Sequence, residues 1–187
     1  RANLKTDPTS PSLRLANLTK LSHNLSVDIY CEQMICSAKL VIIRVIGGVS
    51  YWEYGLEQIR NKVTQVGARL AVVPGDDKID TQLMSYSNIS IDAVDRIWAY
   101  FINGGVDNAF NLIKYASYLL GCEASWKEPA PLLQAGLYWP LLQYPRLEEL
   151  KEYWVGSNKI ALITFYRALV TSGNLKPIDF LIKRLLE

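Results

Sequence analysis

The sequence predicts an α/β fold: a doubly wound, mostly parallel sheet of the flavodoxin-like type, with an inserted helical hairpin and the start of a second α/β unit. The first observation is a nearly continuous apolar run, Leu40 to Ile46, which is interrupted only by Arg44 and stopped by Gly47-Gly48. Such a run is typical of a strand buried on both faces inside a parallel sheet. A second run, Arg69 to Val73, follows after a helical pattern. This order of strand, helix and strand predicts parallel strands joined by a crossover helix.

The elements around the first apolar run can be predicted in chain order. Residues 1–12 contain two prolines and several Ser and Thr residues, which indicates a loose leader. Leu13 to Leu18 alternates enough to predict a short strand, and Ser26 is a candidate N-cap for a helix over 27–38. The crossover helix is expected over 56–66, because its apolar residues recur at intervals of three and four.

A helical hairpin is predicted beyond the second strand. Ser90 is a candidate N-cap for a helix that ends at Gly104-Gly105, and a second helix over 107–120 ends at Gly121. We expect the hairpin to lie on or beside the sheet. With it, the first α/β unit is expected to cover residues 13–121.

The remainder of the chain divides into a connector and a further unit. Residues 122–145 contain four prolines and predict an irregular connector. Residues 146–187 predict a helix near 147–154, a buried type of strand over Lys159 to Tyr166, and a last helix with Pro177 in its first turn. A strand and one helix are only the start of a further strand–helix unit, so we expect a piece of a longer polypeptide.

Composition and charge exclude several classes of function. Charged residues make up 20% of the chain and nearly cancel, at +2, so charge indicates neither nucleic acid nor an acidic membrane surface as a partner. No apolar run approaches the roughly 18 residues that cross a bilayer, and no basic-then-apolar leader opens the sequence. Together with three cysteines in no paired pattern, these features favour a protein of the reducing cytoplasm.

The sequence carries no familiar catalytic pattern. It contains neither a Walker-type phosphate loop nor G-x-G-x-x-G, and its single histidine, His23, leaves little room for imidazole-based nucleophile pairs. We therefore assign no catalytic residue. His23 is a weak candidate metal ligand, since it would need cysteine or carboxylate partners from elsewhere in the fold. The cysteines, Cys31, Cys36 and Cys122, are expected to be buried free thiols rather than a zinc site.

Candidate ligand-binding residues follow the predicted strands, because open α/β sheets bind ligands at the carboxyl ends of their strands. Arg44 needs a partner within its apolar strand, and Asp76 and Asp77 after the next strand are the obvious carboxylates. Arg44 either forms a structural bridge with them or holds an anionic ligand group. The two aspartates could also bind a hard divalent cation, or form a solvated turn. Tyr166 and Arg167 occupy a similar position after the last predicted strand.

Three aromatic residues follow the glycine pair, namely Tyr51, Trp52 and Tyr54. Their rings could stack on a flat ligand at the edge of the sheet. Alternatively, they cap the end of the strand and the helix that follows it.

Six phrases, in order and spread over nearly the whole chain from Leu13, resemble the N-terminal part of the large subunit of aerobic cobaltochelatase. The phrases are LSHNLSVDIY (21–30), RVIGGVSYWEYGLE (44–57), LAVVPGDD (70–77), WAYFINGGVDNAFNLIKY (98–115), EPAPLLQAGLYWP (128–140) and ITFYRALVTSGNLKPIDFLI (163–182). The chain is more distantly similar to the large subunit of magnesium chelatase. Where the family often has Gln-His-Pro, this chain has Ser22-His23-Asn24, so only the histidine matches.

The resemblance implies a function that the residues alone do not. Members of this family insert Co²⁺ into hydrogenobyrinic acid a,c-diamide in cobalamin biosynthesis, and ATP is consumed through two smaller partner subunits, one of them an AAA+ ATPase. The large subunit binds the tetrapyrrole. This piece resembles its leading head region, so the catalytic residues are expected downstream and no cofactor is expected in the piece itself. The alternatives are a non-catalytic α/β docking module and a magnesium chelatase fragment.

Overall fold

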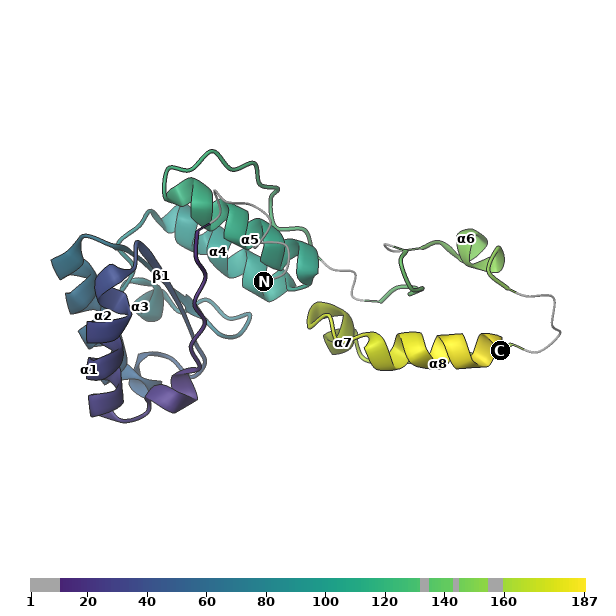
Figure 1. Ribbon diagram of the computed structural model, residues 1–187, viewed down its shortest axis with the longest axis horizontal. Helices are drawn as coiled ribbons and strands as arrows, with labels where there is room; N and C mark the ends of the chain where they lie inside the picture. Colours follow the sequence, from purple (N-terminus) through teal and green to yellow (C-terminus); the bar gives the residue numbers. More distant parts are fainter. Residues whose placement is uncertain (1–10, 132–134, 143–144, 155–159) are drawn as a thin grey trace.

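The computed structural model describes residues 11–131, 135–142, 145–154 and 160–187, so most of the predicted leader lies outside the described residues. The described residues form two strands, eight α-helices and three short 3-10 helices (Figure 1). The strands are β1 (Leu40–Val45) and β2 (Arg69–Pro74). The α-helices are α1 (Asn24–Gln33), α2 (Glu53–Val66), α3 (Thr81–Met84), α4 (Ile91–Asn103), α5 (Val106–Leu119), α6 (Leu147–Lys151), α7 (Arg167–Thr171) and α8 (Lys176–Leu186). The 3-10 helices are η1 (Leu18–Leu21), η2 (Ile35–Ser37) and η3 (Val49–Tyr51).

β1 and β2 form a parallel two-stranded sheet, in a register that runs from Leu40 paired with Arg69 to Val45 paired with Pro74. Helix α2 connects the strands, as the alternation of strand and helix predicts. Both predicted strands and their crossover helix are therefore confirmed. β1 is less buried than its apolar run suggests, because Leu40, Val41 and Ile42 are only partly buried and Arg44 is exposed.

Helices cover both faces of the sheet, which is the middle of three layers (Figure 1). On one face, Ile43 and Val45 share a core with the apolar sides of α1 and α2. On the other face, Ala71 and Val73 share a core with apolar residues of α4 and α5. This division follows from the strand geometry, since alternate side chains point to opposite faces. The predicted helical hairpin therefore packs on the sheet.

The doubly wound, flavodoxin-like sheet is not confirmed, because within the described residues no third strand joins β1 and β2. The strand predicted over Leu13 to Leu18 is wrong: this segment is irregular and leads into η1. The free edge of β2 is covered by a loop instead. The side chains of Ser87 and Asn88 accept hydrogen bonds from the backbone N–H groups of Val72 (2.8 Å) and Leu70 (2.6 Å). Since a loop satisfies these donors, the edge is closed to a further strand.

The first helix begins and ends earlier than predicted. The N-cap of α1 is His23, not Ser26, and the imidazole makes no capping hydrogen bond. The helix predicted over 27–38 ends at Gln33 and is continued by η2.

Helices α6, α7 and α8 lie on the far side of the α4–α5 hairpin from the sheet (Figure 1). The turn between α4 and α5 contacts the end of α7, since the backbone N–H of Gly105 donates to the carbonyl of Thr171 at 2.9 Å. Pro177 lies in the first turn of α8, as predicted. Lys159 lies outside the described residues, and residues 160–166, predicted as a strand, pair with no strand in the part that is described. None of the described helices combines the length and apolar character that a membrane span requires.

Candidate functional site

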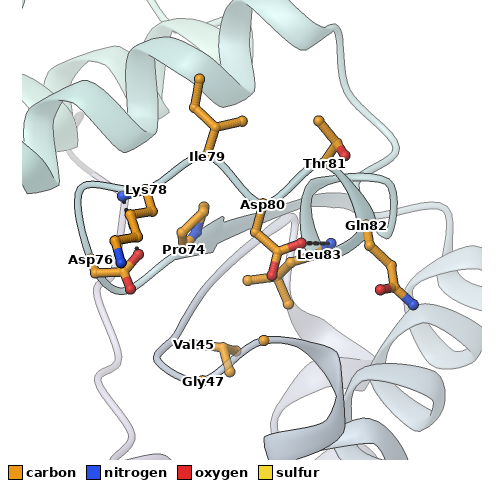
Figure 2. Close-up of a pocket in the computed structure, with 11 residues that line it drawn as sticks. Val45, Gly47, Pro74, Asp76, Lys78, Ile79, Asp80, Thr81, Gln82 and Leu83 are labelled. Carbon is orange, nitrogen blue, oxygen red and sulfur yellow. Dashed lines mark hydrogen bonds between the residues drawn. The ribbon is translucent and has the colours of Figure 1, made fainter.

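A cavity of about 420 Å³ lies at the carboxyl ends of β1 and β2, the edge at which the sequence predicts a ligand site (Figure 2). Val45 and Pro74, the last residues of the two strands, line it. Its polar lining comes from the loop after β2 and the start of α3. These polar residues are Asp76, Lys78, Asp80, Thr81 and Gln82.

Two glycines and one aspartate shape the wall of the cavity. Gly47 and Gly48 turn the chain after β1 with φ of 94° and 77°, a backbone conformation that residues other than glycine rarely adopt. Asp80 caps α3 through one carboxylate oxygen, which accepts from the N–H of Leu83 at 2.9 Å. Its other oxygen would lie 3.3 Å from a Cβ atom at Gly48. The glycine therefore lets the Asp80 carboxylate approach the turn closely.

The predicted bridge between Arg44 and the two aspartates is wrong. Among the ion pairs of the described residues, none joins Arg44 to Asp76 or Asp77. The Arg44 guanidinium donates instead to the carbonyl of Gly75 at 2.6 Å and stacks over the ring of Phe101 at 5.2 Å. Because the side chain points to the solvent side of the strand end, it needs no buried carboxylate.

The aspartates form an exposed turn, which is one of the alternatives that the sequence leaves open. The Asp76 carboxylate accepts from the N–H of Lys78 at 3.3 Å, and the Asp76 carbonyl accepts from the indole N–H of Trp98 at 3.1 Å. Asp76 lines the cavity, whereas Asp77 does not. Within the described residues, no group of three His, Cys, Asp or Glu side chains is placed to hold a metal ion.

The three aromatic candidates diverge and do not form one stacking surface. Trp52 is buried in the core beside α2, and its indole N–H donates to the carbonyl of Leu21 at 2.8 Å. Tyr54 donates to the carboxylate of Asp28 at 2.8 Å, and this hydrogen bond raises the pKa of the phenol. Tyr51 is 60% exposed. Trp52 and Tyr54 thus anchor the start of α2 to neighbouring elements.

His23 and the cysteines do not come together. His23 is exposed at the start of α1. Cys31 is buried, as predicted. Burial is the largest cause that raises the pKa of its thiol, and the negative charge of Asp28 raises it further. The prediction of burial is wrong for Cys36, which is exposed in η2, and Cys122 is half-buried.

Tyr166 and Arg167 lie at the start of α7, on the other side of the α4–α5 hairpin from the sheet (Figure 1). Tyr166 is 87% exposed. The structure therefore does not bring these two candidates to the cavity.

Four polar residues of the cavity were not among the residues predicted from the sequence, namely Lys78, Asp80, Thr81 and Gln82. The available signal was their position, since they directly follow the turn that ends β2. Figure 2 shows Asp76 and Lys78 at one end of the cavity, Gln82 at the other, and Asp80 between them. An ammonium, two carboxylates, a hydroxyl and an amide suit a polar ligand group that both donates and accepts hydrogen bonds.

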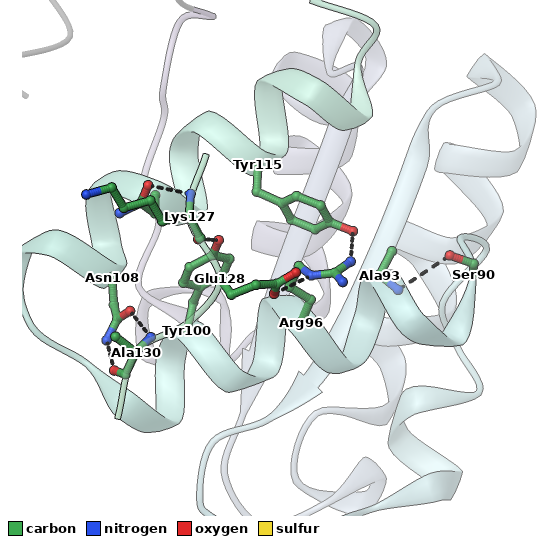
Figure 3. Close-up of polar contacts among 10 residues, drawn as sticks. Ser90, Ala93, Arg96, Tyr100, Asn108, Tyr115, Lys127, Glu128 and Ala130 are labelled. Carbon is green, nitrogen blue, oxygen red and sulfur yellow. Dashed lines mark hydrogen bonds and ion pairs between the residues drawn. The ribbon is translucent and has the colours of Figure 1, made fainter. Parts of the chain in front are cut away.

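A second polar cluster holds the connector against α4 and α5 (Figure 3). Arg96 in α4 donates to Glu128 at 2.9 Å and to the hydroxyl of Tyr115 at 3.2 Å. Its guanidinium also lies over the rings of Tyr115 (5.2 Å) and Trp126 (4.9 Å). The hydrogen bonds to Glu128 and then Tyr115 raise the pKa of Arg96. No spacing in the sequence indicates this cluster, because its members come from three separate segments.

Comparison with known proteins identifies relatives over most of the chain. Residues 98–187 match the family model described as CobN/Magnesium Chelatase. A protein from Sinorhizobium sp, "Aerobic cobaltochelatase subunit CobN", is 38% identical over 183 residues, which cover 93% of this chain. The protein of the same name from Pseudomonas aeruginosa is 34% identical over 165 residues, which cover 88% of this chain. The chain spans 14% and 13% of the lengths of these two relatives.

A solved structure shares the fold. The "Catalytic Subunit of Cobaltochelatase from Mycobacterium tuberculosis" matches 91% of this chain and 13% of its own, with a TM-score of 0.63 and 23% identity. The mixed α/β arrangement described above therefore occurs in that protein as well. The resemblance inferred from the sequence is confirmed, because residues 98–187 match the CobN/Magnesium Chelatase family model and two CobN subunits are similar to most of the chain.

Proposed function

We propose that this chain is a segment of the large subunit of an aerobic cobaltochelatase, from its N-terminal head region. The observation that carries the proposal is the match of most of the chain to two CobN subunits at 38% and 34% identity. The complete subunit would insert its substrate metal, Co²⁺, into hydrogenobyrinic acid a,c-diamide in the cytoplasm. ATP would be consumed by two smaller partner subunits, one of them an AAA+ ATPase.

Within that subunit, we assign this segment a scaffold or binding role rather than the insertion step. Insertion requires that a carboxylated macrocycle is gripped, that its ring N–H protons are removed and that the hydrated ion loses water. Arg44 and Trp52, the candidates for gripping a ring, are engaged with the carbonyls of Gly75 and Leu21. The cavity at the strand ends is the part of this segment that would contact a tetrapyrrole side chain.

A second candidate function is a non-catalytic module that docks a partner protein through the same edge of the sheet. The observation that favours it is the presence of two carboxylates, Asp76 and Asp80, in the lining of the cavity. These charges would repel the carboxylates of the tetrapyrrole. A third candidate is a segment of a magnesium chelatase large subunit, since one family model covers both enzymes.

The enzymatic proposal is tested with the complete subunit, both partner subunits and ATP. We expect absorbance changes that report cobalt insertion into hydrogenobyrinic acid a,c-diamide. Insertion of Mg²⁺ into a porphyrin under the same conditions would favour the magnesium enzyme instead. A stop codon directly after Glu187 in the gene would contradict the proposal that this chain is a segment.

The role of the cavity is tested by titrating the complete subunit with the tetrapyrrole. If the cavity contacts the ligand, Lys78→Ala raises the Kd several-fold, whereas Lys20→Ala, at an exposed lysine in η1, leaves it unchanged. Equal Kd values for both variants would leave scaffold or partner docking as the role of this segment.

A further inference from the structure

Residues 160–166, IALITFY, are seven uncharged residues that belong to no helix and no sheet of the described chain. The backbone N–H and C=O groups of 160–165 form no hydrogen bond with another backbone group within the described residues. The composition is β-branched, aromatic and aliphatic, which strongly favours a strand. Such a segment with unpaired backbone is a template for pairing with another strand.

From Leu162 to Tyr166 the exposure alternates as it does along a strand at the face of a sheet, whereas Ile160 and Ala161 are both exposed. Ile160, Leu162 and Tyr166 are 76%, 84% and 87% exposed, whereas Ile163 and Phe165 are partly buried. The ring of Phe165 packs edge-on against Tyr138 at 5.8 Å. One face of the segment thus rests on this chain, and the other face is open.

A contact outside the segment holds its covered face in place. The hydroxyl of Tyr138 donates to the carboxylate of Asp179 in α8 at 2.5 Å. Burial, and then this hydrogen bond, raise the pKa of Tyr138 to about 12. The ring that supports Phe165 is therefore fixed to α8, which follows the segment in the chain.

We propose that residues 160–166 form a β-strand whose partner is an apolar, extended strand of the same subunit, from outside residues 1–187. This inference rests on the proposed function, in which the chain is part of a longer subunit, and the chain spans only 13–14% of the length of its relatives. Helices α7 and α8 follow the segment directly, so a strand after them would pair in parallel through a helical crossover. The partner strand satisfies the free backbone groups on one edge of the segment, and its side chains pack beside Leu162 and Tyr166 on the open face.

Hydrogen–deuterium exchange tests the proposal directly. In the complete subunit, we expect alternate amides within 161–165, those that face the partner strand, to exchange about 100-fold more slowly than in the 187-residue chain alone. Amides of β1 are protected in both proteins and serve as the internal control. Equally fast exchange of 161–165 in both proteins overturns the proposal. Protection in the 187-residue chain that increases with protein concentration also overturns it, because the partner is then a second copy.

The substitution Leu162→Lys gives an independent readout. It should lower the Tm of the complete subunit and leave that of the 187-residue chain unchanged, because Leu162 is 84% exposed in the latter. Equal effects in the two proteins contradict a partner strand. Both measurements are independent of cobalt insertion, so a subunit that protects 161–165 but inserts no cobalt would contradict the proposed function alone.

Discussion

The side-chain amide of Asn108 binds the backbone of Ala130 through two hydrogen bonds. Its Nδ2 atom donates to the carbonyl at 2.8 Å, and its Oδ1 atom accepts from the N–H at 3.0 Å (Figure 3). Asn108 is buried in α5, and Nδ2 also donates to the carbonyl of Gly104 at 2.7 Å. An amide side chain presents a donor and an acceptor side by side, so Asn108 pairs with the connector as a neighbouring strand would.

The substitution Asn108→Asp tests this relationship. The carboxylate cannot donate to the carbonyls of Ala130 and Gly104, so we expect the free energy of unfolding to fall by about 1–3 kcal/mol. Urea denaturation followed by circular dichroism measures the change. Asn61→Asp, at an exposed position of α2, is the matched control and should remain within about 0.5 kcal/mol of the wild type. Equal losses in both variants would show that the pairing contributes nothing specific.

Replacing Gly55 with alanine is expected to destabilise the protein, although Gly55 lies inside a helix. Alanine normally stabilises a helix by about 1 kcal/mol relative to glycine. At Gly55, however, a Cβ atom would lie 2.1 Å from the buried ring of Trp52. We therefore expect Gly55→Ala to lower the free energy of unfolding by about 1–3 kcal/mol, in a calorimetric or urea measurement.

Gly67→Ala is the control for the glycine series. Gly67 has φ of 71° and no atom within 4 Å of a Cβ position, so the substitution should cost only about 1 kcal/mol of backbone strain. A stabilising Gly55→Ala would mean that the Trp52 ring can move away without loss.

The free energy of unfolding should depend on Arg44 and not on Asp77. Arg44→Ala removes the hydrogen bond to Gly75 and the contact with Phe101, at a cost of about 1–2 kcal/mol. Asp77→Ala should change stability by less than about 0.5 kcal/mol. In a double-mutant cycle of these two substitutions, we expect a coupling energy near zero. A coupling energy well above zero would instead support the predicted ion pair between Arg44 and Asp77.

Alkaline pH should destabilise the protein through Tyr100. Burial raises the pKa of Tyr100 to about 12, whereas the phenol titrates near pH 10 in an unfolded chain. The unfolded state therefore releases its proton first as the pH rises. The contribution of Tyr100 to the free energy of unfolding is complete below about pH 10 and is lost toward pH 12. In that range the free energy of unfolding falls by up to about 1.4 kcal/mol per pH unit.

Unfolding free energies measured from pH 8 to 11 check this dependence. Tyr100→Phe should reduce the slope, although it also removes the hydrogen bond to the Lys127 carbonyl and so lowers stability at neutral pH. Tyr51→Phe, at an exposed ring, should keep the wild-type slope. A slope that Tyr100→Phe leaves unchanged would assign the alkaline loss to other groups.

Local signals in the sequence predicted most of the regular elements. Apolar runs stopped by turn residues predicted β1 and β2, and a cap at Ser90 predicted the start of α4, where the hydroxyl accepts from the N–H of Ala93. Pro177 marked the first turn of α8. These signals succeed because a cap or an apolar periodicity acts over a few neighbouring residues.

The failures concern elements that depend on a distant partner. The segments 13–18 and 160–166 have the composition of strands, but a strand also needs a neighbour with free backbone groups. At the edge of β2, the side chains of Ser87 and Asn88 already satisfy those groups. The sequence pattern of a strand contains no information about whether such an edge is open.

By itself, the sequence determined the alternation of strand and helix, the position of the ligand edge after β1 and β2, and the family resemblance carried by six phrases. Only the tertiary structure decided which side chains meet at that edge. It turned Arg44 to the carbonyl of Gly75 rather than to an aspartate, and it placed Trp52 in the core. The physical reason is that each of these contacts depends on the direction of a side chain and on the space left by glycines such as Gly55, which only the packed structure defines.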